Sequence, residues 1–174
     1  IDLATGRLQV VRELDHHVHH ILWVDAQTLL VNHERDGNGM WTISLDGRPD
    51  RRLRPADAHG RVCHQVISGP RILYETSTPD DISWFGVYDL TIDSWSEWQL
   101  PPGIGYVHTG NDPSGGLFVI EASSAEQHGL YLVTPLPGED RADVELLHLL
   151  DREVYDVLDQ QRYHAHPFLS PDRS

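Results

Sequence analysis

Short runs of apolar and β-branched residues alternate with turn-forming residues along most of the chain. The runs expected to form strands are 8–11, 20–24, 28–32, 40–45, 71–75, 86–90, 116–121, 129–133 and 144–147. Turn signals such as Asp46-Gly47 and Pro102-Gly103 fall between them. Short runs bounded by Gly, Pro, Asp and Asn are typical of antiparallel strands. The pattern therefore predicts an all-β chain, with 151–161 as the one ambiguous segment, which could form a short helix or a loop.

A histidine recurs at a fixed interval at the start of these series of strands. His20, His64 and His108 are 44 residues apart, and His164 follows after 56. Each of them opens a similar series of three or four strands, and a period near 44 with four strands per unit is typical of a β-propeller blade. We therefore expect residues 1–174 to be a single β-propeller domain truncated at both ends, with about three whole blades and two partial ones.

The repeat changes how the histidines are interpreted. In a propeller the first strand of each blade lines the central channel, so residues at matching positions converge at one mouth. The residues expected to form such a ring are His20, His64, His108 and His164. A histidine outside the repeat is more often a surface or strand-face residue, and we expect this for His16, His17, His19, His59, His128 and His148.

Two histidines also lie close together near the end of the chain. Side chains alternate along an extended segment, so His164 and His166 are expected to point to the same side. Gln161, three residues before His164, adds an amide oxygen if the chain turns there. Two imidazoles and an amide oxygen form a ligand set that a divalent transition metal accepts, and the residues alone leave Zn²⁺, Fe²⁺, Ni²⁺ and Mn²⁺ open.

Composition narrows the choice of partners. The chain has 27 acidic and 13 basic residues, for a net charge of −14. This balance argues against nucleic acid, whose affinity comes from neutralised phosphates, but it allows a small anionic substrate at a locally cationic site. No apolar run approaches the ~18 residues of a membrane-spanning helix, and the single cysteine, Cys63, excludes a disulfide framework within the chain. We expect a cytoplasmic protein.

Several segments resemble oligogalacturonate lyases of polysaccharide lyase family 22, which are seven-bladed propellers that cleave short pectin fragments. Gln161-x-x-His164-x-His166-Pro167 is similar to the metal-binding segment of that family. The other matching segments are Asn32-His33-Glu34, Cys63-His64-Gln65 and Tyr106-Val107-His108. In order, they look like the family's His-Glu segment, the segment with the catalytic base and the segment with the remaining metal histidine.

The resemblance implies metal-dependent β-elimination of oligogalacturonides, with Mn²⁺ as the expected metal. The implied metal ligands are His108, Gln161, His164 and His166. His64 is then expected to be the base that removes the C5 proton, and Arg35 is the nearest cation for the substrate carboxylate. His33 and His20 are expected to contact the substrate, a small anionic oligosaccharide.

Two segments depart from the pattern of that family. A stretch beginning at Arg35 replaces the family's Gly-Pro-Trp, and Glu121-Ala122 replaces its Gly-Asp. In such a turn Arg35 is more often an exposed loop charge.

The chain could instead be a non-catalytic TolB-like propeller that binds a partner, or a degenerate lyase homologue that keeps the metal for structure. The histidine–glutamine spacing favours the enzyme, because a scaffold has no need of convergent imidazoles. The oligomeric state stays open.

Overall fold

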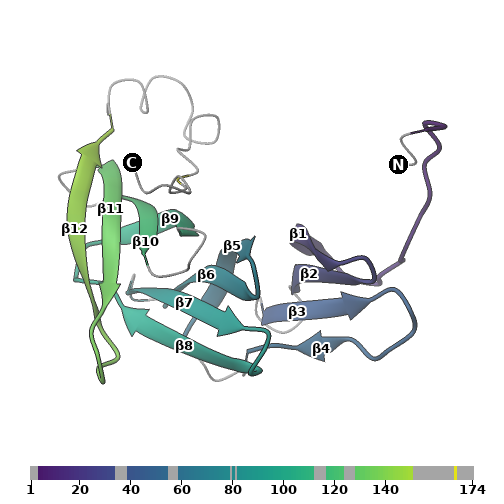
Figure 1. Cartoon of the computed structure of the whole chain (residues 1–174), viewed down its shortest axis with the longest axis horizontal. Helices are drawn as coiled ribbons and strands as arrows, with labels where there is room; N and C mark the ends of the chain where they lie inside the picture. Colours follow the sequence, from purple (N-terminus) through teal and green to yellow (C-terminus); the bar gives the residue numbers. More distant parts are fainter. Residues whose placement is uncertain are drawn as a thin grey trace. The chain divides into compact units, whose positions relative to one another are not determined.

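The computed structural model describes residues 4–33, 39–54, 59–78, 80, 82–111, 117–123, 128–150 and 167. Within these residues every regular element is a strand (Figure 1). The strands are β1 (Val18–Asp25), β2 (Thr28–His33), β3 (Gly39–Ser44), β4 (Arg51–Arg52), β5 (Arg61–Ser68), β6 (Arg71–Ser77), β7 (Ser83–Asp89), β8 (Ser94–Gln99), β9 (Gly105–Asn111), β10 (Phe118–Ser123), β11 (His128–Pro135) and β12 (Ala142–Leu149). The described part of the chain contains no helix long and apolar enough to cross a membrane.

The strands form three four-stranded antiparallel sheets. Their orders are β1-β2-β3-β4, β5-β6-β7-β8 and β9-β10-β11-β12, so each strand pairs with its neighbour in the sequence. Each sheet is one unit of the predicted repeat, since its first strand carries His20, His64 or His108. The prediction of an all-β chain built from four-stranded propeller blades is confirmed.

One expected strand does not form. Residues 8–11 have no strand structure, and Leu8, Val10 and Val11 are 76%, 71% and 54% exposed. An apolar run becomes a strand only where a neighbour completes its ladder of backbone hydrogen bonds. None of the strand pairings among the described residues includes 8–11. The segment 151–161, expected to form a short helix or a loop, lies outside the described residues.

Contacts along the chain divide it into two compact units, Ile1–Ala56 and Asp57–Ser174. The first unit contains the β1–β4 sheet. Its core consists of Leu29, Val31 and Ile43, against which Leu14 and Trp41 pack. Leu14 belongs to the segment before β1, so that segment is held against one face of the sheet. That the chain forms a single domain stays a prediction.

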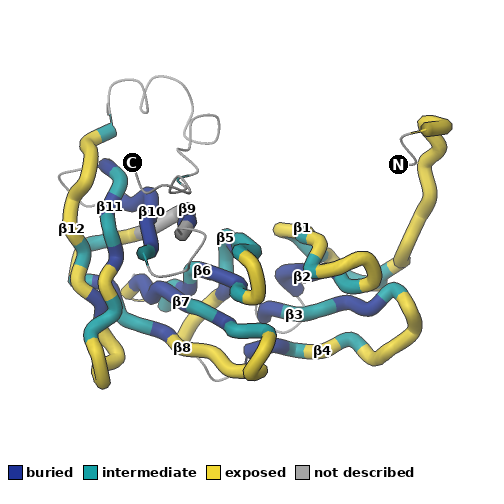
Figure 2. The backbone as a smooth tube through the Cα atoms, viewed as in Figure 1, coloured by how far each residue is buried: buried dark blue, intermediate teal, exposed yellow. Residues whose placement is uncertain are grey.

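The second unit contains the other two sheets, which share one core. Leu73 and Phe85 from β6 and β7 pack in a cluster with Phe118 and Ile120 from β10. The rings of Phe85 and Phe118 lie 4.9 Å apart between centroids. Each such buried side chain stabilises the fold by ~1.5–3 kcal/mol. β7 is largely buried in this unit, whereas β12 is mostly exposed (Figure 2). This shared core brings β5 and β9, the strands with His64 and His108, into contact.

A glycine makes room for an aromatic ring within the β5–β8 sheet. Gly86 on β7 pairs with Tyr74 on β6, and a Cβ atom at Gly86 would lie 2.2 Å from Cε2 of the Tyr74 ring. The ring therefore lies across the glycine. From there the Tyr74 hydroxyl donates a hydrogen bond to Oε1 of Glu97 on β8, at 3.0 Å. A buried carboxylate is tolerated at Glu97 because it has this partner.

Candidate functional site

The repeat-equivalent histidines of β1 and β5 lie at equivalent β-bulges. The pairing register shifts between His19 and Leu22 in β1, and between Cys63 and Val66 in β5. His20 and His64 have φ angles of 50° and 47°, in the left-handed region that residues with a side chain seldom adopt. A bulge re-aims the side chain it carries, so both imidazoles leave the normal alternation of the strand.

The first strand of the third repeat also has a β-bulge, but at a different position relative to its histidine. In β9 the residue Tyr106 pairs with Ala122, and His108 pairs with Glu121. Val107 is therefore the extra residue of this bulge. The distortion precedes His108 by one position, whereas it includes the histidine in β1 and β5.

His64 is held by a carboxylate from the neighbouring strand. Its Nδ1 atom lies 2.9 Å from Oε2 of Glu75 on β6. Burial raises the pKa of Glu75, and the hydrogen bond with His64 and the charges of His64 and His108 oppose this rise. An ionised carboxylate only accepts hydrogen bonds, so the proton of a neutral His64 ring belongs on Nδ1. The Nε2 atom then carries the lone pair that can take a proton.

His108 belongs to a larger group of the same kind. Its Nδ1 atom lies 3.1 Å from Oε2 of Glu121 on β10, and Oε1 of the same carboxyl group lies 3.0 Å from Nε2 of His128 on β11. Glu121 is fully buried and His128 is 6% exposed. The expectation that His128 is a surface residue is therefore wrong. Glu121 pairs with Leu130, and His128 is the diagonal neighbour two residues away on the same face, where it is covered.

The rings of His64 and His108 meet. Their centroids are 4.8 Å apart and their planes are inclined by 64°. The structure thus brings together the expected base and one expected metal ligand, both within the second unit. The other expected ligands, Gln161, His164 and His166, lie outside the described residues, as does Arg35. Among the residues that are described, no group of three or more His, Cys, Asp or Glu side chains is arranged to hold a metal ion.

His20, in the first unit, has an amide where the other two histidines have a carboxylate. Its Nδ1 atom lies 3.2 Å from Nδ2 of Asn32 on β2 and 2.8 Å from Nδ1 of His19. An amide nitrogen only donates, so Nδ1 of His20 is an acceptor and the ring proton belongs on Nε2. His20 therefore presents a hydrogen-bond donor, opposite to the arrangement inferred for His64.

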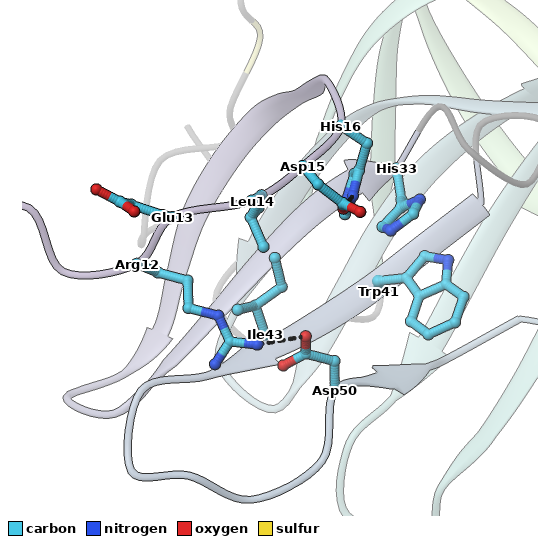
Figure 3. Close-up of a pocket in the computed structure, with 9 residues that line it drawn as sticks. All are labelled: Arg12, Glu13, Leu14, Asp15, His16, His33, Trp41, Ile43 and Asp50. Atoms are coloured by element: carbon cyan, nitrogen blue, oxygen red, sulfur yellow. Dashed lines mark hydrogen bonds and ion pairs between the residues drawn. The ribbon is translucent and has the colours of Figure 1, made fainter.

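His33, the last residue of β2, lies in a pocket of the first unit (Figure 3). Its ring is 3.7 Å from that of His16 and 5.1 Å from that of Trp41, measured between centroids. The pocket has a volume of about 610 Å³ and is lined by Arg12, Glu13, Leu14, Asp15, His16, His33, Trp41, Ile43 and Asp50. Arg12 is neutralised by Asp50 at 2.9 Å. With one cation and three carboxylates, the lining of this pocket is acidic. Contact between His33 and the substrate stays a prediction.

Sequence reasoning missed the partners of the repeat histidines. Asn32, Glu75 and Glu121 follow their histidines by 12, 11 and 13 residues. Each directly follows three apolar residues in the second strand of its sheet. A polar residue at the same place in successive blades is the signal that could have identified them.

The three repeated four-stranded sheets define the chain as part of a β-propeller. Among solved structures, an oligogalacturonate lyase in complex with manganese matches 99% of this chain and 47% of its own length, with a TM-score of 0.76 and 23% identity. An oligogalacturonate lyase from Vibrio parahaemolyticus matches 99% of this chain and 48% of its own, with a TM-score of 0.71 and 20% identity. The expected resemblance is confirmed for the fold, and the chain spans about half the length of these structures.

No protein-family model and no curated protein matches the sequence.

Proposed function

We propose that this chain is part of a metal-dependent lyase that cleaves oligogalacturonides, or closely related uronides, by β-elimination. The observation that carries the proposal is the meeting of His64 and His108, each with Nδ1 on a carboxylate, within the fold of oligogalacturonate lyases. A scaffold gains nothing from a buried and a partly buried carboxylate–histidine pair, because burying such groups costs several kcal/mol unless they are well paired.

The reaction needs a base of moderate strength at C5 of the uronide. In the proposed step, Nε2 of His64 takes the C5 proton. The electron pair of the C5–H bond forms the C4–C5 double bond as the C4–O bond breaks, and the departing oxygen takes up a proton from water. The hydroxide that remains is neutralised by the proton that His64 releases to solvent. Glu75 holds the His64 ring and stabilises the imidazolium that forms, because the positive charge develops next to its carboxylate.

The residues that are described fit a divalent metal at His108. A metal-binding histidine commonly donates its second ring N–H to a carboxylate, and His108 has Glu121 in that place. His108, Gln161, His164 and His166 would hold Mn²⁺. When bound, such a cation would act as a Lewis acid toward the substrate's C6 carboxylate. Arg35 would add positive charge, and His20 and His33 would bind the substrate, with the Nε2–H of His20 donating to an oxygen.

Absorbance of the unsaturated uronide product tests the proposal. Purified protein is incubated with digalacturonate, with and without prior chelation, and Mn²⁺ is then restored. We expect product to form, to stop forming after chelation, and to return with Mn²⁺. Absence of product from digalacturonate and longer oligogalacturonides with Mn²⁺ present would contradict the lyase and favour a TolB-like binding module. Metal binding without product would indicate a degenerate homologue.

A further inference from the structure

Glu121 connects two histidines across three adjacent strands. Its Oε2 atom lies 3.1 Å from Nδ1 of His108 on β9, and its Oε1 atom lies 3.0 Å from Nε2 of His128 on β11. Both carboxyl oxygens are therefore engaged, and by different partners. A carboxyl group held at both oxygens cannot rotate without losing a charge-assisted hydrogen bond, which makes this contact more rigid than a single one.

This group is withdrawn from water. Glu121 is fully buried, and His108 and His128 are 9% and 6% exposed. A carboxylate in such a place costs several kcal/mol unless donors compensate for the lost water. Each of the two histidine rings can supply an N–H donor. The strand register brings this about, because His128 is the diagonal neighbour of Glu121 on one face of the sheet.

We propose that Glu121 and His128 form a brace that fixes the ring orientation and the tautomer of His108, so that its Nε2 lone pair is presented to a divalent cation. The inference rests on the proposed function in taking His108 as a metal ligand. His128 acts through Glu121 and is a positioning residue, since its Nε2 atom contacts the carboxyl group of Glu121. Neither the repeat nor the family pattern indicated this role for His128.

The brace sets His108 apart from His64. The carboxylate of Glu75 contacts His64 and has a side chain that is 12% exposed, whereas that of Glu121 contacts two histidines and has a side chain that is 0% exposed. A proton acceptor benefits from a partner that can adjust as the ring becomes charged, whereas a metal ligand benefits from a ring fixed in one state. The two carboxylates thus match the two roles assigned to their histidines.

The test uses ring-nitrogen NMR of ¹⁵N-histidine-labelled, metal-free protein together with Mn²⁺ titration followed by electron paramagnetic resonance. We expect the proton of His108 on Nδ1 in the unaltered protein. His128→Leu removes the donor and should weaken Mn²⁺ binding ~10-fold or more, with a mixed tautomer at His108. His128→Gln places an amide N–H near the position of the lost Nε2–H and should restore both. His148→Leu, an exposed histidine on β12, is the matched control and should change neither.

Glu121→Gln provides a second route should His128→Leu fail to fold. The donor Nε2–H of His128 draws the amide oxygen of Gln, so the amide N–H₂ faces Nδ1 of His108 and moves the ring proton to Nε2. We expect Mn²⁺ affinity to fall ~10–100-fold. Glu97→Gln, at a buried carboxylate that contacts Tyr74, is the control.

The outcomes separate the brace from the proposed function. A His108 proton on Nε2 in the unaltered protein, or a tautomer and Mn²⁺ affinity unchanged by both His128→Leu and Glu121→Gln, overturns the brace whatever the activity. If the tautomer responds as expected but the protein produces no unsaturated uronide, the brace stands and the proposed lyase reaction fails.

Discussion

The Nδ1 atom of His64 lies 2.9 Å from Oε2 of Glu75, and the same relationship recurs in the next blade between His108 and Glu121 at 3.1 Å. In each case the histidine is on the first strand of a sheet and its partner is on the second. The partner determines which ring nitrogen carries the proton, since a carboxylate accepts from Nδ1. The repeat therefore places chemically defined imidazoles at equivalent positions, and the second strand defines their chemistry.

Replacing His64 separates catalysis from folding. His64→Ala should lower the elimination rate ~10²–10⁴-fold, the usual contribution of a general base, while Mn²⁺ affinity is retained. His64→Gly should be equally inactive but more stable than His64→Ala. Gly avoids the ~1–2 kcal/mol cost of the left-handed conformation at φ 47°. The more flexible unfolded chain of the Gly variant offsets ~0.4–1 kcal/mol of this gain in stability. Product absorbance and urea unfolding measure the two effects.

The control for His64 is His148→Ala, at an exposed histidine on β12. It should leave both rate and stability unchanged. Full activity in His64→Ala would remove His64 as the base while leaving the metal site untouched. A His64→Gly variant less stable than His64→Ala would show that the left-handed conformation does not strain this position.

Gly86 is expected to tolerate no side chain. In Gly86→Ala the new Cβ would lie 2.2 Å from the Tyr74 ring, and Tyr74 is fully buried and hydrogen-bonded to Glu97, so it has little room to move. Overpacking of this kind costs ~2–3 kcal/mol, which urea unfolding would resolve. Gly69→Asn is the control, since Gly69 has φ 56° and open space around it, and Asn tolerates that conformation. Equal losses in the two variants would contradict the close approach of Tyr74.

Stability should depend on pH through Glu75. Burial raises its pKa above the ordinary value of 4.5, so the folded state holds this proton more tightly than the unfolded state. The stability that this group contributes is therefore fully present below pH 4.5 and is lost as the pH rises through the raised pKa. Glu75→Gln should remove this loss and flatten the profile of unfolding free energy above pH 4.5, while lowering activity because His64 loses its carboxylate.

The pKa of Asp46 is shifted in the opposite direction to that of Glu75, so Asp46 provides the control. Hydrogen bonds from the Arg48 and Ser44 side chains hold the pKa of Asp46 far below its ordinary value. Its contribution to stability is present above the ordinary pKa and is lost as the pH falls. Asp46→Asn should therefore lower stability above the ordinary pKa and remove the loss of stability as the pH falls. If Glu75→Gln instead removes a loss of stability that occurs as the pH falls below 4.5, the assigned direction for Glu75 is wrong.

The sequence predicted the repeat well because the repeat depends on local patterns. Strand-forming runs, turn residues and a 44-residue histidine interval all act over short distances, and they were enough to predict four-stranded blades. They failed at 8–11, where strand formation depends on a pairing partner that the described residues do not supply. Exposed apolar residues in that segment look the same in sequence as buried ones.

The candidate site was predicted only in part, because the polar partners of its histidines depend on strand register. Which polar residue meets His64 or His108 is decided by β-bulges that shift the pairing near each histidine. The burial of His128 follows from its diagonal position relative to Glu121, which no spacing rule specifies. The structure thus adds the carboxylates, while the convergence with Gln161, His164 and His166 stays a prediction.

The final prediction concerns the first blade, where Asn32 replaces the carboxylate. Nδ2 of Asn32 lies 3.2 Å from Nδ1 of His20, so we expect the His20 ring proton on Nε2 in ring-nitrogen NMR spectra near neutral pH. Asn32→Asp exchanges the donor for an acceptor and should move the proton to Nδ1, giving His20 the state inferred for His64. Glu75→Gln serves as the reciprocal variant and should shift the His64 proton toward Nε2.

If the His20 proton stays on Nε2 in Asn32→Asp, the second strand does not determine the tautomer of the repeat histidines. The tautomer of His20 would then be set by His19, whose Nδ1 atom is 2.8 Å from that of His20. His19→Leu distinguishes these sources, because it removes the neighbouring ring and leaves Asn32 in place. If Asn32 sets the tautomer, the His20 proton stays on Nε2 in His19→Leu and moves to Nδ1 only in Asn32→Asp.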